Sequence, residues 1–332
     1  MVAMNRLPQQ KTRKHYAGWI VVGVVAALAV VIVLNRAWIY DWFRGATYRP
    51  TAEMEAIRDK LDLTGQGAFL FNAAQPELEP ATEFNTNCRQ DESEIAVLGC
   101  YTAGNIYIYN ITEERLAEIR ELTAAHELLH AVWARMSEEE KVELVEPLTR
   151  VFDANQEMLG EEINSYDVSE KQEELYVRAG TEVKNLPDAL EKHYAEIFKD
   201  QDKIVGFYES YIAVFREIKA QMEKLTSEME SLKAEIDSKM AQYAADFAAL
   251  EGDISSFNSC AETAGCFASE REFYAQRNGL VTREDALNAL NDEINNLVDV
   301  YNVKVEEYNA DVTESRKLQD IINSNSKVDS IK

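Results

Sequence analysis

The feature that most restricts the fold of this chain is a long heptad repeat of apolar residues in its C-terminal half. Between Ile204 and Phe257, apolar side chains recur in alternating steps of four and three residues, with one extra step of four after Ile236. The members after that step are Met240, Tyr243, Phe247, Leu250, Ile254 and Phe257. Such a seam predicts one long helix that buries a narrow stripe against a second helix.

A second apolar seam follows a short break, "NSCAETAGCF", and supplies the expected partner helix. Its members are Leu287, Leu290, Ile294, Leu297, Tyr301, Val305, Tyr308 and Val312. Two heptad arms around a break predict an antiparallel coiled-coil hairpin over residues 191–320. Cys260 and Cys266 fall within the break, where a disulfide would close the tip. The polar residues 321–332 are expected to form a disordered tail.

An uncharged apolar segment, Tyr16 to Leu34, lies near the N-terminus. It is about the length that a helix needs to cross a hydrocarbon core of roughly 30 Å. Trp38, Tyr40 and Trp42 follow it, where aromatic residues favour a membrane interface. Because no A-x-A-like cleavage site follows, we interpret residues 16–34 as an uncleaved transmembrane helix; a long signal peptide is the alternative.

The charges and cysteines around this segment predict its orientation. Basic residues precede it, which favours a cytoplasmic N-terminus. Residues 1–44 would then comprise this cytoplasmic N-terminus and the transmembrane anchor. Four cysteines form two local pairs, Cys88 with Cys100 and Cys260 with Cys266, which suits disulfides in an oxidising compartment; buried free thiols are the alternative. We therefore expect a single-pass protein of the cell membrane whose C-terminal part is extracytoplasmic. The net charge of −25 argues against nucleic acid as a partner.

Residues 45–190 have the mixed pattern of an α+β domain. Short apolar or alternating runs at 67–72, 94–101 and 105–110 predict three strands, the last two of them joined as a hairpin by "TAGN". Residues 73–92 read as a loop that a Cys88–Cys100 disulfide would tie to the second strand. Helices are expected from about Ala52, from an N-cap at Thr112 to about Met136, after an N-cap at Ser137, and from a capping box of Ser169 and Gln172 to Pro187.

The second of these helices carries the string His126-Glu127-Leu128-Leu129-His130. Residues four apart lie on one face of a helix, so His126 and His130 can bind one metal ion, while Glu127 can accept a proton from a metal-activated water. The chain has only four histidines, and the uncharged neighbours of this pair suit a buried helix. The alternative is a core helix with two histidines that find hydrogen-bond partners.

A small sheet, a helix with H-E-x-x-H and a later helix with carboxylates resemble the zincin metallopeptidases, over roughly residues 60–186. The metzincin branch requires a glycine and a third histidine where Trp133 and Met136 stand, so the resemblance is to the gluzincin branch. That branch implies Zn²⁺ held by both histidines and by a glutamate from a later helix. No N-E-x-x-S-D or E-x-x-A-D string is present, so the resemblance does not identify the third ligand.

Two residues of the predicted helix near 170–185 are alternatives for this ligand. Glu174 lies nearer the helix middle, where the resemblance implies the ligand, whereas Glu182 lies near the C-terminal end, where a carboxylate needs compensation. Arg178 stands between them. An oxyanion stabiliser is also expected, but the sequence does not distinguish among its candidates, which are Tyr166, Tyr176, His193 and Tyr194. His193 as a ligand is a minor alternative.

These features together predict a membrane-anchored zinc metalloendopeptidase that hydrolyses protein or peptide substrates with Glu127 as general base. The hairpin would serve as a spacer, as an arm that binds a substrate or a protein partner, as a lid, or in self-association. The rival hypothesis is a non-catalytic, membrane-anchored coiled-coil scaffold or adhesion protein, with or without a structural zinc.

Overall fold

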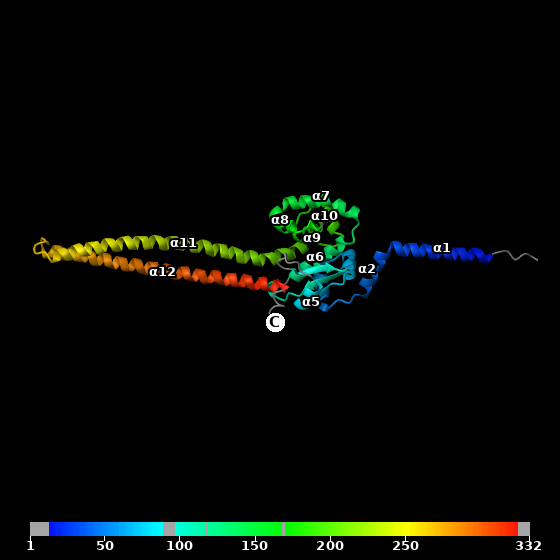
Figure 1. The fold of residues 1–332 in the computed structure, drawn as a ribbon, viewed down its shortest axis with the longest axis horizontal. Coiled ribbons are helices and arrows are strands. Elements are labelled where there is room, and N and C mark those ends of the chain that lie inside the picture. The colour runs from blue at the N-terminus through cyan, green and yellow to red at the C-terminus, as the bar shows by residue number, and fades with distance from the viewer. Residues whose placement is uncertain (1–12, 89–96, 117, 168–169, 325–332) are drawn as a thin grey trace, which may run out of the picture. The chain divides into compact units, whose positions relative to one another are not determined.

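The computed structural model describes residues 13–88, 97–116, 118–167 and 170–324, excluding the side chains of 13–18, 161 and 162 (Figure 1). The chain divides into two compact units. The first comprises Met1–Tyr211 together with Ile322–Lys332, and the second comprises Ile212–Ile321. The boundary thus lies near residue 211 rather than at the predicted residue 190, because the beginning of the first long helix packs into the core of the first unit.

The N-terminal part of the first unit consists of two helices, α1 (Arg13–Leu34) and α2 (Arg36–Thr47). Among the residues described, no single helix is long and apolar enough to be assigned as a membrane span. Trp19–Leu34 and α2 reach that length and hydropathy only as a pair, with a bend of 72° between them. The transmembrane helix over residues 16–34 therefore stays a prediction.

A three-stranded sheet forms one layer of the first unit. Its strands are β1 (Glu77–Glu79), β2 (Gly99–Thr102) and β3 (Asn105–Tyr109), in the order β1-β3-β2. β1 runs parallel to β3, and β2 pairs antiparallel with it, with Cys100 opposite Tyr107. Ala103 and Gly104 make the turn between β2 and β3 with positive φ angles. The predicted hairpin is confirmed, while residues 94–96 of the predicted strand lie outside the described residues.

The structure corrects two predictions in this region. Residues 67–72 are not a strand but part of α4 (Gly65–Ala73), which Thr64 caps by accepting a hydrogen bond from Gly67. A short apolar run suits a buried helix as well as a strand, and tertiary contacts decide between them. The predicted loop at 73–92 contains both β1 and a short helix, α5 (Ala81–Asn87).

Helices make up most of the remaining first unit. They are α3 (Ala52–Leu61), α6 (Ile119–Trp133), α7 (Glu138–Ala154), α8 (Gln156–Ser165), α9 (Lys171–Glu182) and α10 (Asp188–Tyr194). The amphipathic α3 is confirmed, and so is the N-cap of α7 at Ser137, whose capping box is complete.

Two predicted helix ends are wrong. Thr112 does not cap α6, because a 3₁₀ turn at Glu114–Leu116 comes before it. The helix that carries Glu174 does not continue to Pro187; it ends at Glu182, where Val183 takes an extended conformation, and Pro187 instead precedes α10. Of the predicted capping box of this helix, Ser169 lies outside the described residues.

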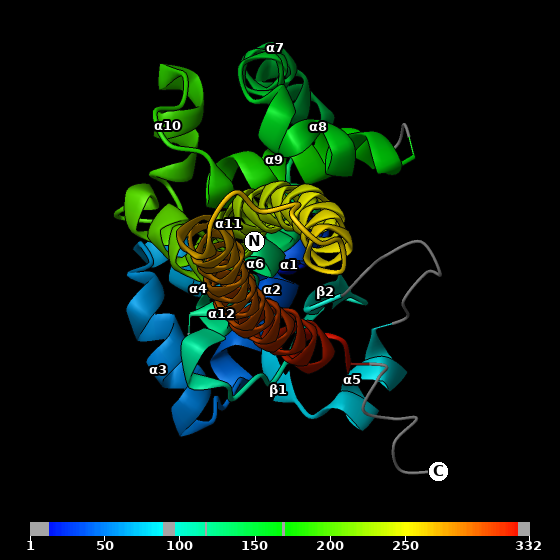
Figure 2. The same ribbon diagram turned by 90° about the vertical axis from the view of Figure 1, so that its left-hand side faces the viewer.

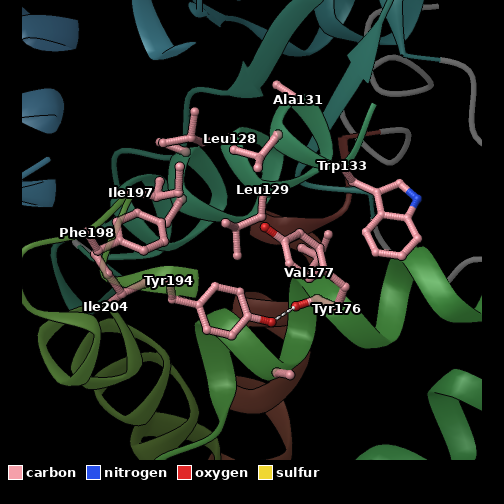
Figure 3. Packing of buried hydrophobic residues seen from close by; sticks show 14 of the residues in the cluster. Leu128, Leu129, Ala131, Trp133, Tyr176, Val177, Tyr194, Ile197, Phe198 and Ile204 are labelled. Carbon is pink, nitrogen blue, oxygen red and sulfur yellow. Dashed lines mark hydrogen bonds between the residues drawn. The ribbon is translucent and has the colours of Figure 1, made fainter. Parts of the chain in front are cut away.

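Helix α6 lies at the centre of the first unit, between the sheet and helices α7–α10 (Figures 1 and 2). The side chains of Leu128, Leu129 and Ala131 are fully buried on it, and they pack with Tyr176 and Val177 of α9 (Figure 3). Because one side of α6 is embedded in this core, its orientation is determined by packing, and the residues on its other side are held rigidly.

The second unit confirms the predicted hairpin. It is built from most of α11 (Gln201–Ala261) and α12 (Glu270–Ile322), whose arms are joined by the ion pairs Lys239–Glu293, Lys304–Glu228 and Arg283–Asp253. These ion pairs show that the arms are antiparallel, since the partners on α12 come earlier in the sequence as those on α11 come later. The disulfide Cys260–Cys266 lies at the tip and links the last turn of α11 to the loop that precedes α12.

Two details of the second half of the chain differ from prediction. Met240, Phe247 and Ile254 belong to the predicted seam but remain exposed, whereas Ile236 and Leu250 are buried. The extra step of four after Ile236 rotates one row of the seam away from the partner arm. At the C-terminus, α12 extends to Ile322 and Ser324 is buried, so residues 321–324 are ordered rather than part of a disordered tail. Residues 325–332 lie outside the described residues.

Candidate metal centre

The two histidines of the H-E-x-x-H string lie on one face of α6. His126 and His130 are one turn apart, their ring centroids are 5.1 Å from each other, and both side chains are partly exposed. Leu128 and Leu129, which lie between them in sequence, point into the core (Figure 3). The periodicity of the helix therefore separates a packed face from a face that carries ligand atoms.

Helix α9 brings a carboxylate to this histidine face. Oε1 of Glu174 lies 3.3 Å from Nε2 of His130, and its Oε2 lies 4.0 Å from Nε2 of His126. The close packing of α6 and α9 depends on Gly180, since a Cβ there would lie 2.5 Å from Cδ1 of Leu129. Ligand atoms of His126, His130 and Glu174 all lie within 4.8 Å of one another, so this group can hold a metal ion.

The carboxylate of Glu174 is suited to bind a cation. Its Oε2 atom is buried and has no hydrogen-bond partner within the described part of the chain. A buried carboxylate oxygen without a hydrogen bond is costly, and a bound cation would remove that cost. Two imidazoles and one carboxylate, with further positions open, also form a donor set that divalent metals such as zinc accept. The residues present therefore fit a metal ion.

The other candidate ligand, Glu182, has a different partner. Its Oε1 atom accepts a hydrogen bond of 3.0 Å from Arg178, and Nε of Arg178 lies 3.8 Å from Oε2 of Glu174. Arg178 therefore stands between the two glutamates, as the sequence indicated. The structure brings Glu174 to the histidines and places Glu182 against Arg178 instead.

Glu173 belongs to the site as well, although its position in the sequence did not indicate it. Its Oε1 atom lies 2.8 Å from Nδ1 of His130, so the two ring nitrogens of His130 face two consecutive glutamates of α9. A carboxylate on the far nitrogen of a ligating histidine orients the ring and makes it a better ligand. The only sequence signal was the pair of adjacent glutamates in the first turn of α9, where acidic residues are common in any helix.

The charges of this cluster differ between the two histidines. Burial and the neighbouring His130 lower the pKa of His126 to about 3. Burial also opposes a positive charge on His130, but the hydrogen bonds with Glu173 and Glu174 outweigh it and raise the pKa of His130 to about 10. Burial opposes ionisation of Glu174, yet the hydrogen bond with His130 lowers the pKa of Glu174 to about 2. In the metal-free protein at neutral pH, His126 is neutral and His130 carries a proton between two carboxylates.

Glu127 is buried beside the edge strand β2. A Cβ on Gly99 would lie 2.8 Å from Oε1 of Glu127 and 2.5 Å from Cγ2 of Thr123, so only glycine allows β2 this close to α6. The backbone of Tyr101 hydrogen bonds to the Glu127 carboxylate. Burial raises the pKa of Glu127 to about 7, which places its proton exchange near neutral pH.

Tyr101 is itself held by a chain of polar contacts that reaches α2. Its hydroxyl accepts a hydrogen bond of 2.9 Å from Arg135, which follows α6. Arg135 also donates to both carboxylate oxygens of Asp41, at 2.8 and 2.9 Å. On the same strand as Tyr101, Cys100 forms the predicted disulfide with Cys88 at the end of α5. The strand next to Glu127 is thus restrained by a disulfide and by a hydrogen bond from Arg135, which Asp41 holds in place.

Three of the four oxyanion candidates lie together, two of them, Tyr176 and Tyr194, fully buried and His193 half-buried. The Tyr176 hydroxyl lies 3.0 Å from Nε2 of His193, and the Tyr194 hydroxyl donates a hydrogen bond of 2.6 Å to the backbone oxygen of Tyr176 (Figure 3). The Tyr176 ring packs against Trp133 with centroids 5.0 Å apart. His193 is not a member of the metal-binding group. Tyr166 is the C-cap of α8.

The arrangement combines a potential cation site with a buried carboxylate whose pKa lies near neutrality. Such a pair can support proton transfer to and from a water molecule at the ion. Protein-family models, curated proteins and solved structures were each compared with the chain, and no match was found. The likeness to zincins therefore stays a prediction from the sequence.

Proposed function

We propose that this protein is a membrane-anchored zinc metalloendopeptidase. The observation that carries the proposal is the convergence of His126, His130 and Glu174 on one point, with Glu127 buried beside them. Three protein ligands leave a coordination position open, as catalytic zinc sites do and closed structural sites do not. In this proposal residues 16–34 cross the cell membrane, and the domain that carries the site is extracytoplasmic.

The side chains have separate roles in the proposed reaction. His126, His130 and Glu174 would hold the zinc ion, which when bound lowers the pKa of water and polarises a peptide carbonyl. Glu127 accepts the proton of the attacking water and passes it to the departing amine. The backbone hydrogen bond from Tyr101 keeps the Glu127 carboxylate in place, and Glu173 keeps the His130 ring oriented through Nδ1.

Strand β2 supports a peptide as the substrate. Within the described residues β2 pairs only with β3, so it is an edge strand, and it runs past Glu127 at Gly99. An extended peptide can add to such an edge through backbone hydrogen bonds. This placement would bring a peptide bond to the carboxylate regardless of the side chains nearby, and it favours a protein or peptide substrate.

A second candidate is a non-catalytic scaffold that acts through the hairpin. The observation that favours it is the exposed row of Met240, Phe247 and Ile254 on α11, which repeats every seven residues and suits a further helix. The occupant of that row could be a protein partner or a second copy of the chain. The two candidates differ in whether Glu127 is needed for any chemical step.

The proposal is tested with the full chain, because the predicted boundary at residue 45 would cut through α2. Zinc content and hydrolysis of fluorescent casein are measured for the wild type, His126→Ala and Glu127→Gln in phospholipid nanodiscs. We expect one zinc per chain in the wild type and in Glu127→Gln, and loss of zinc in His126→Ala. Hydrolysis should occur only in the wild type. A wild type without zinc, or a Glu127→Gln variant that still hydrolyses casein, would overturn the proposal.

A further inference from the structure

Two of the three charged residues of helix α2, Asp41 and Arg44, face the protein, whereas most of its apolar residues face outward; only Arg36, at its first position, is a charged residue on the exposed side. Asp41, Arg44, Gly45 and Tyr48 lie at helical steps of three and four and form the inner side. Asp41 is buried against Arg135 with two hydrogen bonds. Arg44 donates to the backbone oxygens of Ala73 at 2.7 Å and of Gly104 at 3.0 Å, and also to the side chain of Asn105.

Between Arg36 at its start and Thr47 at its end, the exposed side of α2 is apolar and aromatic. Its exposed fractions are 59% for Trp38, 37% for Ile39, 59% for Tyr40, 54% for Trp42 and 61% for Phe43. The helix cannot rotate to bury these side chains without breaking the hydrogen bonds of Asp41 and Arg44. The fold of the first unit therefore keeps these aromatic side chains exposed.

A helix with this orientation is suited to apolar surroundings on its outer side. In water the apolar side of a surface helix faces the core and the charged side faces solvent. Clustered exposed aromatic side chains mark a contact surface, and tryptophan and tyrosine in particular favour the boundary between lipid headgroups and acyl chains. A lipid surface matches this composition better than water does.

The chain next to α2 indicates which apolar medium covers it. Trp19–Leu34, which is uncharged, joins α2 through Asn35 with a bend of 72°. A helix bent sharply away from an apolar segment suits a position in the plane of the membrane interface. We infer that α2 lies in the headgroup region of a lipid bilayer, with the side of Trp42 and Phe43 toward the acyl chains. The inference rests on the proposed membrane anchoring but not on zinc or catalysis.

This placement has a consequence for the candidate metal centre. Asp41 of α2 binds Arg135 at the end of α6, and Arg135 binds the Tyr101 hydroxyl. The helix that carries His126 and His130 is therefore attached to the interfacial helix by a bidentate ion pair rather than by a flexible linker. The metal centre is held at a set distance from the bilayer surface, where it would reach protein segments close to the membrane.

The test measures the position of single tryptophans of the full chain in phosphatidylcholine vesicles. Phenylalanine replaces the other three tryptophans, so that only Trp42 or only Trp19 remains. The quenchers are phosphatidylcholines brominated either near the headgroup end or near the methyl end of the acyl chain. We expect bromine near the headgroup to reduce Trp42 fluorescence by roughly half and bromine at the chain end to reduce it less.

Quenching of Trp19 tests the proposed anchoring independently of the inference about α2. If Trp19 is quenched and Trp42 is not, the anchoring stands and the interfacial position of α2 is overturned. If neither is quenched, both fail. If Trp42 is protected from aqueous acrylamide but unaffected by brominated lipid, a protein surface covers it, and the lipid assignment is again overturned.

A matched pair of variants completes the test. In a chain whose only tryptophan is Trp38, changing Phe43 to serine removes an apolar contact with lipid and should weaken quenching of Trp38 by brominated lipid. Val142→Ser removes an exposed apolar side chain from α7 and should leave that quenching unchanged. Equal quenching in both variants would contradict a role for this side of α2 at the lipid surface.

Discussion

Oε1 of Glu174 lies 3.3 Å from Nε2 of His130, although the two residues belong to helices separated in the chain by α7 and α8. The short distance arises because α9 packs closely against α6, where Gly180 lies beside Leu129. This contact completes a group of three potential metal ligands. Sequence spacing alone did not identify the third of them.

Glu174→Gln should weaken zinc binding by more than about a hundredfold, because it removes one of only three protein ligands. Glu182→Gln is the matched control on the same helix face. It should change zinc affinity by less than about threefold, since Glu182 binds Arg178. Competition with a chromogenic chelator measures both constants. Equal losses of zinc affinity in the two variants, or a larger loss in Glu182→Gln, would show that Glu174 is not the third ligand.

Glu173→Gln should weaken zinc binding by about ten- to a hundredfold without changing the number of zinc ions bound. The carboxylate at 2.8 Å from Nδ1 orients the His130 ring and makes its Nε2 a better donor. Glu170→Gln, an exposed change just before α9, is the control and should bind zinc as the wild type does. If Glu173→Gln binds zinc with wild-type affinity, the contact does not position His130.

Zinc binding at pH 8 should release close to one proton from His130. The pKa of His130 is raised to about 10 in the metal-free protein, and the protonated ring cannot coordinate a metal. Zinc affinity should therefore rise about tenfold per pH unit in this range and level off near pH 10. Calorimetric titration in buffers with different ionisation enthalpies counts the proton directly. A count of zero would show that His130 is already neutral.

The same shift of the His130 pKa has a consequence for the stability of the metal-free protein. Since the folded-state pKa lies above the unfolded value, the stabilising contribution is fully present below about pH 6.5 and is lost as the pH rises through about 10. Chemical denaturation of the metal-free protein across this range measures the loss, and His130→Gln should remove it.

Gly99→Ala should destabilise the first unit by about 1–3 kcal/mol or displace the Glu127 carboxylate, because the new Cβ would overlap Thr123 and Glu127. Adding Thr123→Ser removes the closest contact and should restore part of the stability. Gly160→Ala on α8 is the control, since its Cβ would meet only Gln156 at 3.9 Å. Urea denaturation compares the variants. Wild-type stability together with wild-type hydrolysis in Gly99→Ala would contradict the close approach of β2 to α6.

Features with local periodicity could be predicted from the sequence. The heptad steps predicted both arms of the hairpin, and the spacing of His126 and His130 placed them on one helix face. The paired cysteines predicted both disulfides. Residues 67–72 show the limit of such reasoning, because a short apolar run has no period that separates a strand from a buried helix. The reversed orientation of α2 could not be predicted from local periodicity either, since it depends on partners far along the chain, such as Arg135.

The sequence by itself determined the helix that carries His126, Glu127 and His130, because helical spacing depends only on nearby residues. It could not choose between Glu174 and Glu182, which lie on the same face of α9 two turns apart. Only the packing of α9 on α6 made that choice, and it also brought Glu173 to the far side of His130. A metal site made from two helices depends on how those helices pack, and that packing is a property of the whole core.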